Sequence, residues 1–303
     1  MVRLVKKFFK LTFLILILIA IYIYRVDIYK FYYDNLVSAK DKVSKLEKNK
    51  YYREYNFNYV KNTNNFIPEN KQDIMNIYYT IINSGMNNFT FYCPSNYNGC
   101  QDDINDVANN QEVLSNINNF VHPYNSFKSI QTEISSAGEI NVIIEKVYDD
   151  KMIYLIDYEI EKIINKEIDK NSSQKEKIKV VHDYIINNTT YDQERSDNKI
   201  TKYSSDNAFG VLTENYGVCG GYTDTMMLFL EEFGVKSIRV SSENHIWNYV
   251  YVDNEWLHLD LTWDDPISNN NENILDDTYF LIDNSKLEQI NSEEHYFDKD
   301  VYK

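Results

Sequence analysis

The chain has 303 residues and a hydrophobic fraction of 43%, which suits a globular protein with a buried core and excludes a disordered one. Its formal net charge at pH 7 is −15, and six of the 31 basic residues lie within the first 30 positions, so the remainder carries about −20. An acidic body repels polyanions, which argues against DNA or RNA as a partner.

The N-terminus has the pattern of a membrane anchor. A basic head over residues 3–10 runs into an apolar segment over residues 8–24, which is about the shortest length that spans a bilayer. A cleaved signal peptide is the alternative, but no small-residue cleavage site follows Ala20. We therefore expect residues 1–30 to be a signal anchor with a transmembrane helix, giving a single-pass membrane protein with its C-terminal body outside the cytoplasm.

Two regions with different patterns follow. Residues 31–68 are charged and rich in tyrosine, and we expect a juxtamembrane helix and linker that acts as a spacer. Helical and strand periodicities alternate over residues 69–170, which predicts a small α+β domain with an accessory role. Its expected elements are a helix over 73–83, a strand over 87–92, a helix over 104–120, a hairpin of 127–134 and 139–148, and a helix over 153–168.

The chain has three cysteines, so one is left over whichever way they pair. Cys93 and Cys100 flank a turn-rich loop and can close a short disulfide if the body lies outside the cytoplasm. They can equally be two unrelated buried residues, and the sequence leaves both readings open. If they pair, Cys219 is the free thiol.

Residues 171–303 are expected to form the second domain. A capped helix over 175–187 opens it, and His182 on this helix is expected at the edge of the core. An apolar run over 279–282 predicts a late strand.

The strongest chemical signal of this domain begins at Cys219. Apolar residues recur at helical spacing after it and stop at Gly234, so a helix begins at the cysteine. The partial positive charge at a helix N-terminus favours a thiolate over a thiol. Gly220 and Gly221 are expected to leave room for a substrate carbonyl, with the backbone N–H of Cys219 as one oxyanion donor.

A predicted hairpin brings a histidine and a carboxylate together. His245 opens a strand expected over 245–252, and the Asp-Asn dipeptide at 253–254 is a turn signal before a second strand over 255–263. A two-residue loop makes His245 and Asp260 diagonal neighbours on one face, so the carboxylate can hold the imidazole in one tautomer. A slip of the register by one residue would separate them.

These residues are the expected parts of an acyl-thioester mechanism. Cys219 is the nucleophile, His245 the base and Asp260 the residue that orients the base. Aromatic and glycine residues nearby are expected to wall the substrate site and keep it dry, although an aromatic core is the simpler reading of the tryptophans. The expected walls are Gly220, Tyr222, Trp247 and Trp263.

Three motifs resemble the bacterial branch of the transglutaminase-like superfamily of papain-type thiol enzymes. They are Gly-Val-Cys-Gly-Gly-Tyr at 217–222, His-Ile-Trp-Asn at 245–248 and Asp-Leu-Thr-Trp-Asp-Asp-Pro at 260–266, and the likeness extends over residues 171–297. The resemblance implies an α+β fold with a papain-like core, in which the helix that bears the cysteine packs on an antiparallel sheet that bears the histidine and the aspartate.

The resemblance also implies the roles of Cys219, His245 and Asp260 given above. No residue matches the family's second oxyanion donor, and Tyr203 and Asn207 are the candidates that we consider. The implied activity is that of an extracytoplasmic thiol enzyme on amide bonds of proteins or peptides, as a cysteine peptidase or an acyltransferase, with cell-wall or surface proteins as substrates. A non-catalytic scaffold of the cell envelope is the alternative.

Other polar clusters give weaker signals. Acidic residues on both sides of the asparagine-rich stretch 269–273 would suit a calcium loop, but the ligand spacing of an EF-hand is missing, and we expect a solvated loop, no metal and no cofactor. The acids concerned include Asp264 and Asp276. His122 and His295 have no acidic or thiol neighbours that suggest a role.

Overall fold

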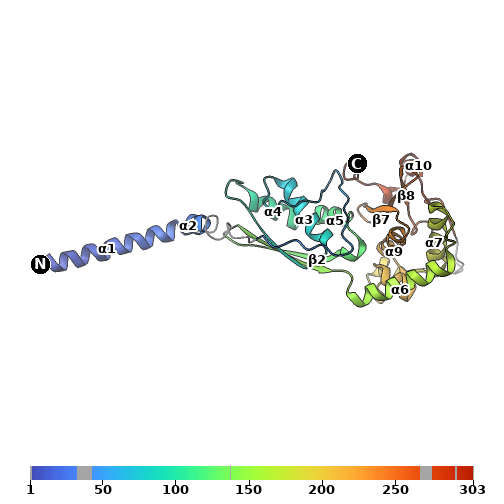
Figure 1. The fold of residues 1–303 in the computed structure, drawn as a ribbon, viewed down its shortest axis with the longest axis horizontal. Helices are drawn as coiled ribbons and strands as arrows, with labels where there is room; N and C mark the ends of the chain where they lie inside the picture. The colour runs from blue at the N-terminus through green and yellow to red at the C-terminus, as the bar shows by residue number, and fades with distance from the viewer. Residues whose placement is uncertain (1, 33–42, 137, 267–274, 291, 303) are drawn as a thin grey trace.

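The protein is described by a computed structural model that covers residues 2–32, 43–136, 138–266, 275–290 and 292–302. The N-terminal helices α1 (Val2–Ile23) and α2 (Arg25–Tyr32) project away from a body that holds the rest of the described chain (Figure 1).

The transmembrane helix expected over residues 8–24 is not supported. Within the described residues, no helix is both long enough and apolar enough to cross a membrane.

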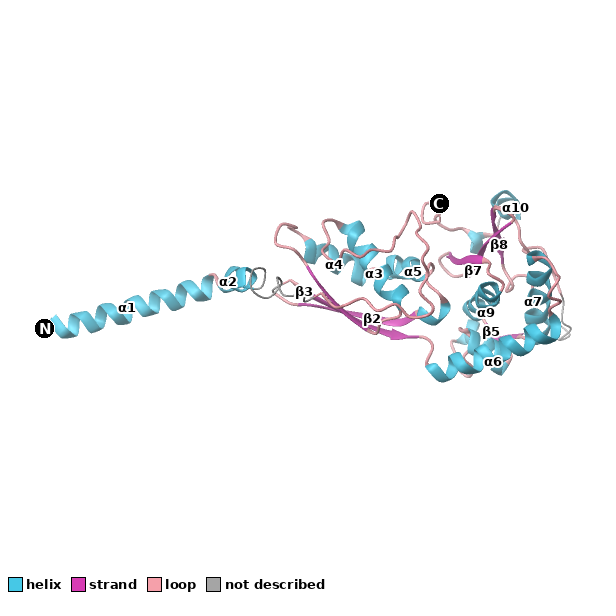
Figure 2. Cartoon of the chain, in the orientation of Figure 1, coloured by secondary structure: helices cyan, strands magenta, loops and turns pink. Residues whose placement is uncertain are grey.

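The first part of the body is a three-stranded antiparallel sheet with helices on one face (Figure 2). The strand order is β1-β3-β2. The expected helix over 104–120 is two helices, because Asn110 is extended and its side chain accepts a hydrogen bond from the backbone N–H of Val113 to start the second. The elements are α3 (Lys71–Ser84), β1 (Asn88–Tyr92), α4 (Cys100–Asn109), α5 (Gln111–Asn118), β2 (Phe127–Ile134) and β3 (Glu139–Lys146).

Residues 43–68, which we name the N-terminal strap, differ from the spacer expected there. The strap has no helix, and it runs against the body: Ser44 exchanges hydrogen bonds with Thr90 of β1. Val60 is fully buried. The Arg53 guanidinium, also buried, donates to the backbone carbonyl of Ser237 at 2.9 Å. The strap is therefore part of the packed body.

The two cysteines near this sheet are joined. Cys93 follows β1 and Cys100 begins α4, and a disulfide links them. This selects the first of the two readings that the sequence left open.

The second part of the body is a helix packed on an antiparallel sheet. The strands pair in the order β6-β7-β8, and α9 packs against β6 and β7. The expected α+β class and the helix-on-sheet core are confirmed. The elements are α6 (Asp150–Glu167), α7 (Gln174–Asn188), β4 (Thr190–Tyr191), α8 (Gln193–Asn198), β5 (Tyr216–Gly217), α9 (Cys219–Glu232), β6 (Lys236–Ser241), β7 (Ile246–Val252), β8 (Glu255–Leu259) and α10 (Asn284–Ile290).

The hairpin of β7 and β8 has the turn that the sequence predicts. Asp253 and Asn254 both have positive φ, 53° and 65°, and Val252 pairs with Glu255. Strand β8 is shorter than expected and ends at Leu259. The late strand expected over 279–282 is wrong, because among the described residues this segment makes only an isolated bridge, from Ile282 to His258.

Candidate active site

Cys219 is the first residue of α9, as expected, and it is half-buried and free of any disulfide. The two glycines that follow it allow a close approach of the chain. A β-carbon at Gly221 would lie 2.3 Å from the carbonyl oxygen of Ser205, and one at Gly220 would lie 2.8 Å from that of Asp206. The glycines therefore let the helix start pack against the preceding loop.

His245 directly precedes β7 and Asp260 directly follows β8, so the hairpin brings both to one end of the sheet. The His245 Nε2 and Asp260 Oδ2 atoms are 2.5 Å apart, and both residues are buried. The backbone N–H groups of Thr262 and Trp263 donate to Asp260 Oδ1 at 3.0 and 3.3 Å. Because a carboxylate only accepts, His245 donates its Nε2–H to Asp260, which leaves its other ring nitrogen free of Asp260 in the cavity that Cys219 also lines.

The electrostatics of this group favour a charged imidazole. Burial alone would lower the pKa of His245, but the charge of Asp260, its hydrogen bond and a hydrogen bond with Cys219 raise that pKa to about 10. Burial would raise the pKa of Asp260, yet the charge and hydrogen bond of His245, with a hydrogen bond from His295, hold it well below its usual range. A protonated His245 beside an ionised Asp260 is suited to stabilise a thiolate at Cys219.

A cavity of about 640 Å³ opens at Cys219 and His245. Trp263 lies along its wall with 36% of its surface exposed. Tyr191, which sequence reasoning missed, is a further wall, because the parallel pairing of β4 with β5 sets it beside Gly217, two residues before the cysteine. A carbonyl group entering this cavity from solvent can reach the thiol.

Comparison with known proteins agrees with this geometry. The family model described as the transglutaminase-like superfamily matches residues 162–261, a range that includes Cys219, His245 and Asp260. Over these residues the chain is similar to a transglutaminase-like domain. No curated protein sequence matches the chain.

Two solved structures are similar to parts of the chain. One, titled as a crystal structure of a TGase, has 20% identity over 48% of this chain and 46% of its own, with a TM-score of 0.35. The other, a cysteine protease candidate from Cytophaga hutchinsonii, has 15% identity over 44% of this chain and 61% of its own, with a TM-score of 0.29. The chain thus spans about half the length of the first structure.

The expected walls of the transglutaminase-like site are only partly found. Trp263 lines the cavity, whereas Gly220, Tyr222 and Trp247 do not. Trp247 is fully buried. The hydroxyl of Tyr222 donates to Asp265 Oδ2 at 2.5 Å, and Asp265 lines the cavity, so Tyr222 shapes the site indirectly.

The side chains considered as oxyanion donors are not brought to the thiol. Neither Tyr203 nor Asn207 lines the cavity. The ring of Tyr203 stacks on Tyr216 with centroids 3.7 Å apart. The Asn207 side chain accepts a hydrogen bond from the backbone N–H of Phe209 at 3.0 Å. The backbone N–H of Cys219 stays the one donor that we predict.

His295 is a second residue of this site that sequence reasoning missed. Its Nε2 lies 2.8 Å from Asp260 Oδ2, the oxygen that also accepts from His245. Nothing in the sequence links it to Asp260, 35 residues before it, so only the fold reveals the contact. The ligand atoms of His245, Asp260 and His295 lie within 4.8 Å of one another, which is the spacing of a possible metal site, but both Nε2 atoms already donate to the shared oxygen.

The acidic stretch considered as a calcium loop has other contacts where it is described. Asp264 is buried, and its Oδ2 lies 3.1 Å from His182 Nε2 while its Oδ1 accepts from the backbone N–H of Tyr279 at 2.8 Å. The solvated loop expected there is wrong for Asp264, and His182 is fully buried, deeper than the core edge expected for it. Residues 269–273 lie outside the described part of the chain.

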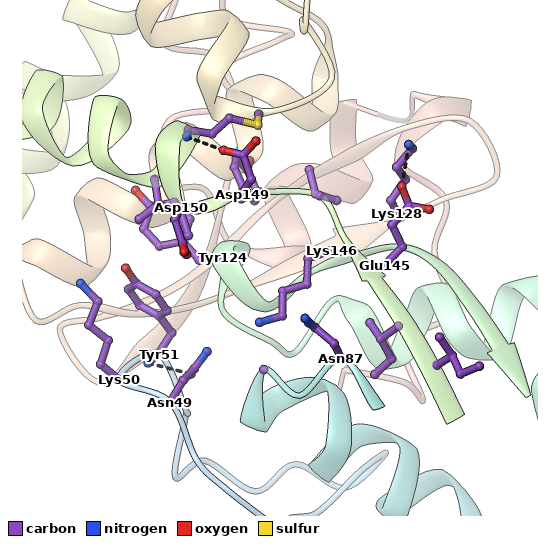
Figure 3. Close-up of a pocket in the computed structure, with 17 residues that line it drawn as sticks. Asn49, Lys50, Tyr51, Asn87, Tyr124, Lys128, Glu145, Lys146, Asp149 and Asp150 are labelled. Carbon is purple, nitrogen blue, oxygen red and sulfur yellow. Dashed lines mark hydrogen bonds and ion pairs between the residues drawn. The ribbon is translucent and has the colours of Figure 1, made fainter. Parts of the chain in front are cut away.

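A larger cavity, about 1070 Å³, lies among the strap, the end of β3 and the start of α6 (Figure 3). The side chains of Lys146, Tyr51 and Asn87 surround its middle in this view. Its lining holds neither a cysteine nor a histidine. The nucleophilic chemistry therefore belongs to the smaller cavity at Cys219.

Proposed function

We propose that the protein is a thiol enzyme that cleaves or transfers amide bonds of proteins or peptides through a thioester on Cys219. The observation that carries this proposal is the position of His245, which is hydrogen-bonded to Asp260 through Nε2 and lines the same cavity as Cys219. This is the arrangement that a cysteine nucleophile needs, with a base beside it and a carboxylate that fixes the base.

The reaction follows from these contacts. The thiolate of Cys219 attacks the carbonyl carbon of an amide, and the backbone N–H of Cys219 donates to the oxygen that becomes negative. His245, as imidazolium, gives its proton to the leaving amine, and a thioester remains. Water or a second amine then attacks the thioester, and His245 takes the proton of the attacking group while the thiolate of Cys219 leaves, which restores the thiolate and the imidazolium.

We also propose that the body of the protein works outside the cytoplasm, on cell-wall or surface proteins. The disulfide between Cys93 and Cys100 supports this location, because such bonds persist in oxidising compartments.

The activation of Cys219 can be tested with iodoacetamide, because Cys219 is the one cysteine outside the disulfide. At neutral pH, we expect alkylation of the native protein to be at least about tenfold faster than in a His245→Ala variant, because the imidazolium stabilises the thiolate. His122→Gln is a matched control, a buried histidine of the first part of the body that should leave the rate unchanged. Equal rates with and without His245 would refute the proposal.

The reaction type needs a second measurement. The native protein is incubated with a glutamine-containing protein and a fluorescent amine, with Cys219→Ala as the control. Incorporation of the amine identifies an acyltransferase, and new peptide termini identify a peptidase. If the native protein does neither and behaves as the Cys219→Ala variant does, the chain is a non-catalytic scaffold of the cell envelope.

A further inference from the structure

His295 lies on a short turn, Glu293–His295, outside the residues that match the family model. Its Nε2 is 2.8 Å from Asp260 Oδ2, and His245 Nε2 is 2.5 Å from the same oxygen. A carboxylate oxygen only accepts hydrogen bonds, so both imidazoles donate to it. One oxygen of Asp260 therefore accepts hydrogen bonds from both the expected base, His245, and a second histidine, His295.

Packing alone does not account for a histidine at this position. The rings of Tyr279, Trp247 and Trp263 surround His295, with centroid distances of 4.7, 4.9 and 5.2 Å. Its Nδ1 is buried without a hydrogen-bond partner among the described residues. An apolar side chain would fill such a pocket without leaving a buried nitrogen unpaired. The polar contribution of His295 is its single bond to Asp260.

The carboxylate does not depend on His295 for its place in the fold. Asp260 Oδ1 is held by the backbone N–H groups of Thr262 and Trp263. Replacement of His295 therefore leaves the carboxylate near His245. It chiefly changes how strongly the charge of Asp260 stabilises the His245 imidazolium.

We propose that His295 is a positioning residue of the thiol site, which donates to Asp260 and so limits how strongly that carboxylate stabilises the His245 imidazolium. The inference rests on the proposed function, because it concerns how readily His245 gives up and takes a proton. Both protonation states of His295 act in the same direction. A neutral His295 imidazole weakens the stabilisation of the His245 imidazolium, because it donates a hydrogen bond to the same carboxylate oxygen. A cationic His295 also repels the His245 imidazolium directly.

Several ionisable groups face His295 and also affect the protonation of His245. The groups on its own turn are Glu293 and Glu294, which are both exposed, and the others belong to the hairpin and to the segment after it. They are His245, His258, Asp260 and Tyr279. None of them is altered by a substitution at His295, so a change in the titration of the site reports the lost donor.

The test uses two variants of the full chain that differ in one property. Glutamine reaches about as far as histidine and keeps an N–H donor at its end, whereas methionine has the same length and no donor. The rate of Cys219 alkylation by iodoacetamide is measured against pH for the native protein, His295→Gln, His295→Met and His245→Ala. The upper midpoint of this profile reports loss of the proton from His245.

We expect His295→Met to move the upper midpoint upward by about half a pH unit or more, and His295→Gln to stay close to the native profile. Midpoints that coincide in the native protein and His295→Met overturn the inference. Equal shifts in both variants, or failure of both to fold, also overturn it, because they assign His295 to packing. Failure of the proposed function looks different: native and His245→Ala profiles would then coincide.

Discussion

Arg239 of β6 offers a sharp test of how the two parts of the body are held together. The side chain is buried, and its Nη2 lies 2.6 Å from Asp224 Oδ1 on α9. Its Nη1 donates to the backbone carbonyls of Asn118 and Val121 at 3.0 and 3.2 Å, and its Nη2 donates to Ser126 Oγ at 2.9 Å. One side chain thus joins the helix that begins at the thiol to the loop after α5.

Arg239→Met keeps the length of the side chain and removes its charge and all of its donors. Among the described residues, Asp224 then keeps only the hydroxyl of Tyr148, at 2.6 Å, as a partner for its buried carboxylate. Breaking a buried ion pair from one side costs about 3–5 kcal/mol, and the carbonyls left without a donor push the loss toward the upper end. That is a large share of the roughly 5–15 kcal/mol by which a native protein is stable.

Urea unfolding followed by tryptophan fluorescence measures this loss of free energy. Lys128→Met is the matched control, because its ion pair with Glu145 is exposed on both sides and should contribute little. Adding Asp224→Asn to Arg239→Met removes the unpaired charge, and we expect it to recover about 1 kcal/mol or more. If Arg239→Met unfolds at the same urea concentration as Lys128→Met, the buried pair does not hold the two parts together.

Two further predictions concern stability. Burial lowers the pKa of His258 to about 4 despite its hydrogen bond with Asn284, so the folded protein keeps this ring neutral while the unfolded chain takes a proton below about 6.5. Stability should therefore fall as the pH drops from about 6.5 to about 4, by up to about 3 kcal/mol from this residue, and urea unfolding of His258→Gln should show a weaker dependence over that window. Replacing Cys93 and Cys100 by serine should cost about 2.5 kcal/mol, because the disulfide closes a short loop in the unfolded chain, and reduction of the native protein should lower its melting temperature similarly. If the stability of His258→Gln depends on pH as that of the native protein does, the first prediction is wrong. If the serine variant melts at the same temperature as the native protein, the second is wrong.

The sequence predicts local geometry well wherever a turn or a helix start decides it. The Asp-Asn turn at 253–254 sets the register of the hairpin, and this register is enough to bring His245 and Asp260 together. The start of α9 at Cys219 follows likewise from the spacing of apolar residues and the glycine after them.

Contacts between segments far apart in the chain were not predictable in this way. His295 is separated from Asp260 by 35 residues, and it lies in an irregular segment with no periodicity to give its direction. The helix break at Asn110 was missed because the apolar spacing on both sides continues in phase, and only the capping side chain marks the boundary. The close packing of Gly220 and Gly221 on the loop at Ser205 and Asp206 was not predicted, because the sequence does not show the course of that loop.

Residues on both sides of the matched domain hold the elements of the thiol site in position. Asp224 lies on α9 just over a turn after Cys219 and is held by Tyr148, which precedes the match at residue 162. After the match, the hydroxyl of Tyr302 accepts from Asn119 Nδ2 at 2.8 Å and from the backbone N–H of Ser241 at 3.1 Å. The C-terminal segment that carries the second histidine is thereby tied to both parts of the body. The residues that set the position of the thiol and of its base therefore come from the whole body, and the accessory part is a structural component of the site.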